Sequence, residues 1–181
     1  MRLIFFKFTV LIGFLLFGVG GMSLPVSAQE NNVAPEAFSH SGLKLPRFVS
    51  LGKRQTNVRA GPGQRYPVKW VMHRKSLPVE IVLEFENWRK IRDHEGQSGW
   101  VYHTLLSGKR TALIRGEVDV PVRDRTCADD GKSRVSAYFE PMVQVGVERC
   151  DGECCYVNTD SFSGWIKRKF LWGVYEDEKF D

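Results

Sequence analysis

Short stretches of alternating apolar and polar residues, separated by tight-turn residues, recur along most of the chain. The clearest covers residues 79–86, where Val, Ile, Leu and Phe alternate with mainly acidic neighbours. This period of two predicts a strand with one face on a core. Residues 88–92 and 99–102 predict two further strands, with a turn at Asn87 and another at 94–97. Because no segment after residue 30 shows a sustained period of 3.6, the pattern predicts an all-β fold of short antiparallel strands.

The chain also repeats part of itself. Gly99-Trp100-Val101 returns as Gly164-Trp165-Ile166, and Val58-Arg59 returns as Val122-Arg123, with offsets of 165 − 100 = 65 and 123 − 59 = 64. A unit of about 65 residues can close around its own core, whereas units of about 20–50 residues must stack to do so. We therefore predict two tandem copies of one small antiparallel β-barrel.

The N-terminus predicts a secretory signal peptide. Two basic residues accompany a glycine-interrupted apolar run, and the small residues Val26-Ser27-Ala28 fit a cleavage site after Ala28. An uncleaved anchor is the alternative, because a slightly longer apolar stretch could span a bilayer. The expected organisation is a signal peptide at 1–28, a polar flexible leader at 29–45, barrels at 46–110 and 111–176, and a tail at 177–181.

Charge adds little to this picture. The formal net charge is +5, and removal of residues 1–28 lowers it to (26 − 2) − 21 = +3. Basic and acidic residues are interleaved, whereas nucleic-acid-binding proteins cluster their basic residues. We therefore expect no nucleic-acid partner and no stable membrane insertion after signal cleavage.

The four cysteines, Cys127, Cys150, Cys154 and Cys155, all lie in the second copy. In an exported chain this even number predicts two disulfides, for which three connectivities exist. Neighbours on a strand face opposite sides, so Cys154 and Cys155 are expected to have different partners. A zinc site is the alternative, but it needs reduced thiolates, which an oxidising compartment disfavours. All four histidines precede the second copy, which disfavours a cysteine and histidine catalytic pair.

No other pattern indicates catalysis. The turn Gly61-Pro62-Gly63 lacks the ending of a phosphate-binding loop. The three acidic residues Glu80, Glu84 and Glu86 share one parity of a strand, which predicts an outward, solvated face. The sequence therefore predicts a non-enzymatic protein without catalytic residues, metal or cofactor.

Several motifs of the first copy resemble those of bacterial SH3-like domains, and more narrowly the exported tandem SH3-like proteins of Gram-negative bacteria. They are Asn57-Val58-Arg59-Ala60-Gly61-Pro62-Gly63, Leu77-Pro78-Val79-Glu80-Ile81, Asn87-Trp88 and Gly99-Trp100-Val101. The resemblance covers roughly residues 45–175 and is weaker in the second copy. It implies two five-stranded barrels in the periplasm with a binding or scaffolding role. In related proteins such modules target cell-wall hydrolases to peptidoglycan.

The resemblance also assigns individual residues. It implies an aromatic ligand groove built from Tyr66, Trp70, Trp88 and Tyr102, because flat apolar rings bind extended peptides or sugar rings. Trp100, which recurs as Trp165, is expected to be core instead. In the second copy Cys154 takes the place of Trp88, and the Gly-Pro-Gly turn is missing, so that copy is expected to be structural.

In SH3-like domains the position of Trp88 faces the loop that carries Cys127 in the second copy. The resemblance therefore implies a Cys127–Cys154 disulfide, with Cys150–Cys155 across a hairpin turn. The chain is thus expected to be a periplasmic binding protein that recognises a peptide or a peptidoglycan component. The alternative is a structural subunit of an envelope complex that has no free ligand.

Overall fold

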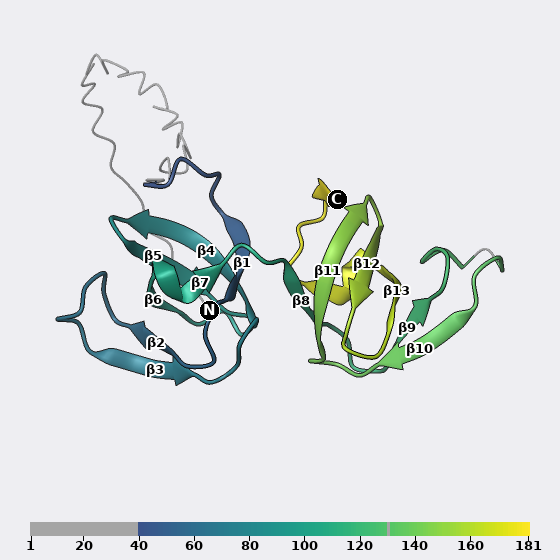
Figure 1. Ribbon diagram of the computed structural model, residues 1–181, viewed down its shortest axis with the longest axis horizontal. Helices are drawn as coiled ribbons and strands as arrows, with labels where there is room; N and C mark the ends of the chain where they lie inside the picture. Colours follow the sequence, from purple (N-terminus) through teal and green to yellow (C-terminus); the bar gives the residue numbers. More distant parts are fainter. Residues whose placement is uncertain (1–39, 130) are drawn as a thin grey trace, which may run out of the picture. The chain divides into compact units, whose positions relative to one another are not determined.

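The structure, a computed structural model, describes residues 40–129 and 131–181, and over these residues it is all-β (Figure 1). The described part contains no α-helix, only the 3-10 turns η1 (His103–Leu105) and η2 (Arg168–Phe170). Hence it holds no helix that could cross a membrane. The predicted signal peptide and residues 29–39 of the predicted leader lie outside the described residues. The all-β prediction is confirmed.

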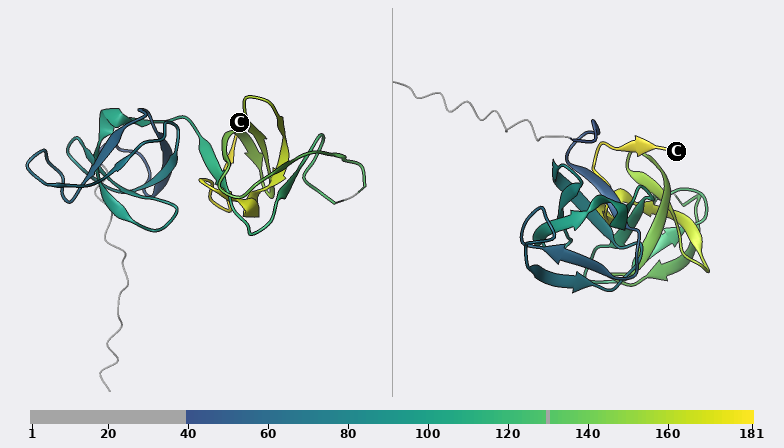
Figure 2. Two further views of the ribbon diagram at one scale, coloured as in Figure 1. Left: turned by 90° about the horizontal axis from the view of Figure 1, so that it is seen from below. Right: turned by 60° about the vertical axis from the view of Figure 1, so that its left-hand side comes forward.

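The first sheet has seven antiparallel strands in the order β3-β2-β6-β5-β4-β1-β7. Its hydrogen-bonded path begins at β3 and ends at β7, so the sheet curls around its core without closing into a complete barrel (Figure 2). The strands are β1 (Arg47–Leu51), β2 (Thr56–Arg59), β3 (Val68–Met72), β4 (Pro78–Phe85), β5 (Trp88–Arg92), β6 (Ser98–Tyr102) and β7 (Leu106–Ser107).

The second sheet repeats this topology strand for strand. Its order is β10-β9-β13-β12-β11-β8-β14, and β15 (Lys179–Phe180) adds to β11 within the segment predicted as a tail. The two predicted tandem units are therefore present, each as an antiparallel sheet. The other strands are β8 (Thr111–Ile114), β9 (Val120–Arg123), β10 (Val135–Phe139), β11 (Gln144–Asp151), β12 (Cys154–Asn158), β13 (Ser163–Lys167) and β14 (Leu171–Trp172).

The two repeated sequence motifs form one contact in each sheet. Arg59 on β2 pairs with Trp100 on β6, and a Cβ atom added to Gly99 would lie only 2.5 Å from Val58 Cγ1. In the second sheet Arg123 pairs with Trp165, and a Cβ atom on Gly164 would lie 2.6 Å from the Arg123 carbonyl oxygen. Since such distances are too short for real Cβ atoms, glycine is required before each tryptophan.

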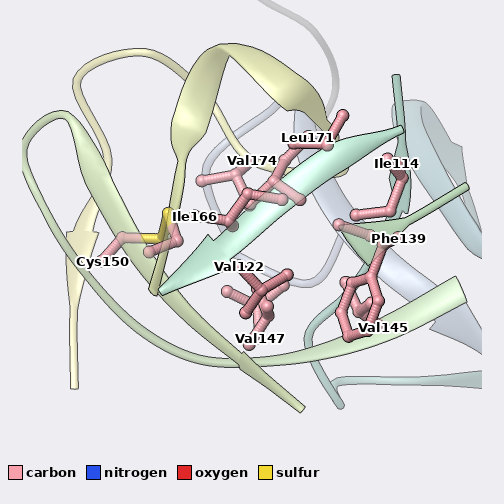
Figure 3. Packing of buried hydrophobic residues seen from close by; sticks show 13 residues of the cluster. Ile114, Val122, Phe139, Val145, Val147, Cys150, Ile166, Leu171 and Val174 are labelled. Carbon is pink, nitrogen blue, oxygen red and sulfur yellow. A yellow bond between two sulfur atoms is a disulfide. The ribbon is translucent and has the colours of Figure 1, made fainter. Parts of the chain in front are cut away.

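Each sheet encloses its own apolar core. The first core consists of Val49, Leu51, Val58, Met72, Val79, Ile81, Ile91 and Val101. The second is larger and includes Ile114, Val122, Phe139, Val145, Val147, Ile166, Leu171 and Val174 together with the half-cystines Cys150 and Cys155 (Figure 3).

The prediction of a solvated acidic face on β4 is wrong for two of its three residues. Glu80 is 4% and Glu84 1% exposed, although Glu86 is exposed. The β4–β5 register shifts between Ile81 and Leu83, and this irregularity exchanges the inward and outward positions beyond it. As a result Glu84 is buried and Phe85 is 50% exposed.

Glu84 is held by three neighbouring segments. Its Oε1 accepts from Arg47 Nη2 on β1 at 2.5 Å and lies 3.0 Å from Arg89 Nε on β5. The backbone N–H and the hydroxyl of Ser41 donate to the same carboxylate at 2.7 and 2.9 Å. Residues of the predicted leader thus contact the first sheet, where Leu45 also packs against the core.

Contacts link the two sheets, which belong to one compact unit. Phe48 on β1 packs against Trp172 and Tyr175, with ring centroids 5.2 and 4.7 Å away. The Tyr175 hydroxyl donates to Glu80 Oε1 at 2.7 Å, and burial together with this carboxylate raises the pKa of Tyr175. Glu80 Oε2 accepts from Arg92 Nε and Nη2 at 2.8 and 2.5 Å, so the buried carboxylate is satisfied by both halves of the chain.

Candidate functional site

The first sheet carries a small groove where its longest loop faces two strand ends. We call this cavity of about 190 Å³ the first groove. Its lining comes from β2, the β2–β3 loop, the start of β5 and the segment from the end of β6 into η1. The lining residues are Asn57, Arg59, Gln64, Trp88, Tyr102, Thr104 and Leu105.

Two aromatic rings form the apolar part of the first groove. Trp88 and Tyr102 are directly opposite each other on β5 and β6, and their rings meet edge to face with centroids 5.4 Å apart. Trp88 is 9% exposed and Tyr102 is half-buried. Trp88 therefore forms the base of the groove, and Tyr102 is the ring that a ligand can reach.

Arg59 holds the loop wall of the first groove in place. Its Nη1 donates to the carbonyl oxygens of Gln64 at 3.2 Å and Tyr66 at 2.8 Å. Both acceptors lie in the β2–β3 loop, whose turn begins at Gly61. A Cβ atom at Gly61 would lie 2.5 Å from the Tyr66 ring, so this turn fits only because the residue is glycine. The loop is thereby fixed from both sides.

The structure brings together two of the four aromatic residues assigned to ligand binding. Trp88 and Tyr102 line the first groove, but Tyr66 packs over Gly61 and Trp70 packs against the first core. The sequence interpretation missed the polar lining residues, which are Asn57, Arg59, Gln64 and Thr104. Asn57 and Arg59 belong to a motif that carries the resemblance, and Arg59 also recurs as Arg123, but neither signal had assigned them to a groove.

By exposure alone, Trp88 and Trp100 rank in the order opposite to the one expected. Trp88 is 9% exposed and Trp100 is half-buried, and neither residue belongs to the first or the second core. Trp100 lies across from Arg59 and Lys90 at the strand surface, which explains its partial exposure. The tryptophan common to both copies, Trp100 or Trp165, therefore follows the glycine and pairs with the arginine of the neighbouring strand.

We expect Trp88→Ala to destabilise the first sheet by about 3 kcal/mol, because it removes a large buried ring. Trp100→Ala is expected to cost less, since a half-buried ring loses less apolar contact. Urea denaturation of both variants, measured beside the unmodified chain, checks the order. Equal destabilisation, or a larger loss for Trp100→Ala, would contradict the burial seen here.

In the second sheet a disulfide takes the place of the buried tryptophan. Cys154 begins β12 as Trp88 begins β5, and it bonds to Cys127 in the β9–β10 loop, with the Cα atoms 5.6 Å apart. Cys150 bonds to Cys155 across the β11–β12 hairpin. These are the two pairings that the resemblance favoured. The same bonds occupy every thiol that the alternative zinc site required.

A groove persists in the second sheet at the equivalent place. This second groove has a volume of about 240 Å³ and is lined by Pro121, Arg123, Cys127, Asp129, Lys167, Lys169 and Phe170. Arg123 again donates to the carbonyl of its loop, at Ser133, 3.2 Å away. The second copy thus keeps a hollow at this place although the tryptophan is missing; its expected structural role stays a prediction.

Comparison with known proteins identifies part of the chain. Residues 52–108 match the bacterial SH3 domain family, which confirms the resemblance for the first sheet from β2 to β7. A search of curated proteins found no match.

Two solved structures of Trichomonas vaginalis, NlpC1 and NlpC2, share 12% and 10% sequence identity with this chain. Each similarity covers 75% of this chain and 48% or 51% of the other, with TM-scores of 0.32 and 0.33. The chain therefore spans about half the length of these structures, and similarities this low carry no functional argument.

Proposed function

We propose, starting from the bacterial SH3 match of residues 52–108, that the chain is a non-enzymatic binding protein of the periplasm whose first groove takes part of a peptide or of a peptidoglycan component. The observation that carries this proposal is the pair of rings, Trp88 below and Tyr102 beside the opening, flanked by neutral polar side chains. Export is proposed from the small residues that precede Gln29.

The size and chemistry of the first groove limit what it can take. At about 190 Å³ it is smaller than cavities that enclose a whole small molecule, which run from about 300 to 1,000 Å³. One side chain or one sugar ring fits this scale. Asn57, Gln64 and Thr104 supply amide and hydroxyl groups that match the backbone of a peptide or the hydroxyls of a sugar, and Tyr102 supplies a face for stacking.

The lining of the first groove supports binding in preference to catalysis. It includes no carboxylate, no imidazole and no thiol. Arg59 is its one charged member, and its guanidinium is committed to two loop carbonyls. General acid and base chemistry needs titratable groups near neutral pH, which this set does not supply.

A structural subunit of an envelope complex is the second candidate. It is favoured by large apolar side chains that are exposed in the second copy, where Val118 of the β8–β9 loop is 74% and Tyr138 of β10 is 63% exposed. These two side chains line one shallow hollow with Asp119. Adjacent exposed apolar residues of this kind are typical of protein contact surfaces.

We expect Tyr102→Ala to weaken binding to peptidoglycan sacculi by about tenfold, as loss of a stacked ring costs about 1–3 kcal/mol. The melting temperature should change little, because Tyr102 is half-buried. Cosedimentation with intact sacculi and a thermal melt provide the two measurements.

Tyr138→Ala is the matched control, since it removes the same side chain from an exposed place outside the groove. Equal binding by Tyr102→Ala and the unmodified chain would contradict the first-groove proposal. If the chain does not bind sacculi, and Tyr138→Ala releases a protein that copurifies with it, the structural role is the better account.

A further inference from the structure

The second groove has lysines at two positions where the first groove has a tyrosine and a threonine. Lys167 ends β13 where Tyr102 ends β6, and Lys169 lies in η2 where Thr104 lies in η1. With Arg123, three cationic side chains line this cavity, and Asp129 is their one acidic neighbour in the lining. At the end of the same strand, the first copy therefore has an aromatic ring that can stack on a ligand, and the second copy has a positive charge.

A carboxylate of the chain itself already lies in the second groove. Asp129 Oδ1 accepts from Arg123 Nη2 at 2.5 Å, and Lys167 Nζ donates to Oδ2. The hydrogen bond and charge of Lys167, together with Arg123, lower the pKa of Asp129. Two cations on neighbouring strands thus hold one carboxylate between them.

The Asp129 carboxylate is replaceable. Its side chain is 59% exposed, and it is carried by a loop, whereas Arg123 and Lys167 project from strands. Exposed ion pairs contribute little stability, so a competing carboxylate would displace Asp129 at small cost.

Lys169 gives the second groove a third cation, in addition to Arg123 and Lys167, which both bind Asp129. Its Nζ lies 5.0 Å from the centre of the Phe170 ring, and among the described residues it forms no ion pair with an acid. Lys167 and Lys169 also border a hollow of about 740 Å³. The other charged residues of that hollow have both signs, which gives it no preference for anions; they are Arg115, Glu153, Arg168, Glu176 and Asp177.

We propose that the second groove is a carboxylate-binding site that takes an acidic side chain of an extended peptide. Arg123 and Lys167 bind the carboxylate where Asp129 now sits, and Lys169 attracts the next acidic group along the ligand. Carboxylate is favoured as the ligand group because the groove already holds one. This proposal concerns other residues than the first groove and does not rest on the function proposed there.

The test uses the full chain and a fluorescently labelled hexaglutamate peptide, with binding followed by anisotropy at low and moderate salt. We expect binding that weakens with salt, as contacts between exposed charges do. Lys169→Gln should weaken it about three- to fivefold, the effect of one exposed charge pair. Asp129→Asn should tighten it, because the internal competitor loses its charge.

Lys53→Gln, which removes the same charge from an exposed residue of the first copy, is the control and should leave binding unchanged. Equal losses in Lys53→Gln and Lys169→Gln would reveal unspecific attraction and overturn the proposal. So would binding of hexaglutamine at the same affinity, or weaker binding after Asp129→Asn. Tighter binding of a polyphosphate of equal length would identify phosphate as the ligand group and equally reject a carboxylate site.

Discussion

We expect reduction of both disulfides to unfold the second sheet and to leave the first sheet folded. The Cys127–Cys154 bond closes a loop with a sequence separation of 27, and Cys150–Cys155 one of 5. The chain-entropy model assigns them about 3.6 and about 2 kcal/mol. Their sum rivals the whole stability of a domain of this size, which is about 3–5 kcal/mol from its core. Hydrogen exchange with and without reductant, read separately for β1–β7 and β8–β15, measures the outcome.

Two double variants separate the contributions of the disulfides. Cys127→Ser with Cys154→Ser should lower the free energy of unfolding of the second sheet more than Cys150→Ser with Cys155→Ser, because it opens the larger loop. Protection of the second sheet that survives full reduction would disprove the expectation. Loss of protection in both sheets would show instead that the first sheet depends on the second.

Glu84→Ala should destabilise the first sheet by about 3–5 kcal/mol, since removal of one partner leaves the half-buried Arg47 and the buried Arg89 without their carboxylate. It also releases Ser41, which donates to Glu84 twice. Urea denaturation followed by hydrogen exchange of β4 and β5 provides the measurement. Glu117→Ala, at an exposed site, is the control for the lost charge and should change stability little.

The pH dependence of the stability difference between the unmodified chain and Glu84→Ala gives a second check. Burial alone would raise the pKa of Glu84, but the hydrogen bonds from Arg47 and Ser41 outweigh it, and the pKa is lowered in the folded chain. A depressed pKa stabilises the fold above the unfolded value of about 4.3 and ceases to do so as pH falls through the folded pKa. The gap between the unmodified chain and Glu84→Ala should therefore be constant near neutral pH and shrink below about pH 4.

The pattern of residues was sufficient to predict the fold, because strands and repeats are marked by residues that lie close together in the sequence. Alternation around Val79 and Ile81 marks a strand, and the repeated Gly-Trp marks a second copy, without any knowledge of distant contacts. The same alternation failed at Glu84, because the register irregularity after Ile81 exchanges the two faces, and sequence periodicity does not reveal where such an irregularity falls.

The candidate site was less accessible to sequence reasoning. Its rings were found because aromatic residues are conspicuous, yet Tyr66 and Trp70 look the same in sequence as Tyr102 and belong to a turn and a core. The polar lining of the first groove comes from β2, the following loop and η1. Asn57 and Arg59 lie in a motif that carries the resemblance, but the resemblance had not assigned them to ligand binding. The cations of the second groove stand out only when Lys167 and Lys169 are compared, position by position, with Tyr102 and Thr104.

The close approach at Gly99 and Gly164 has a consequence for how such duplicated chains can diverge. In each copy the glycine lies under the Val-Arg pair of another strand, so a new side chain there collides with the neighbouring strand whatever else has changed. The two copies could therefore replace a tryptophan with a cystine and a tyrosine with a lysine while both short motifs persisted. A Val-Arg pair followed some 40 residues later by Gly-Trp, 99 − 58 = 41 in the first copy and 164 − 122 = 42 in the second, is thus a compact signature for finding other divergent duplicates.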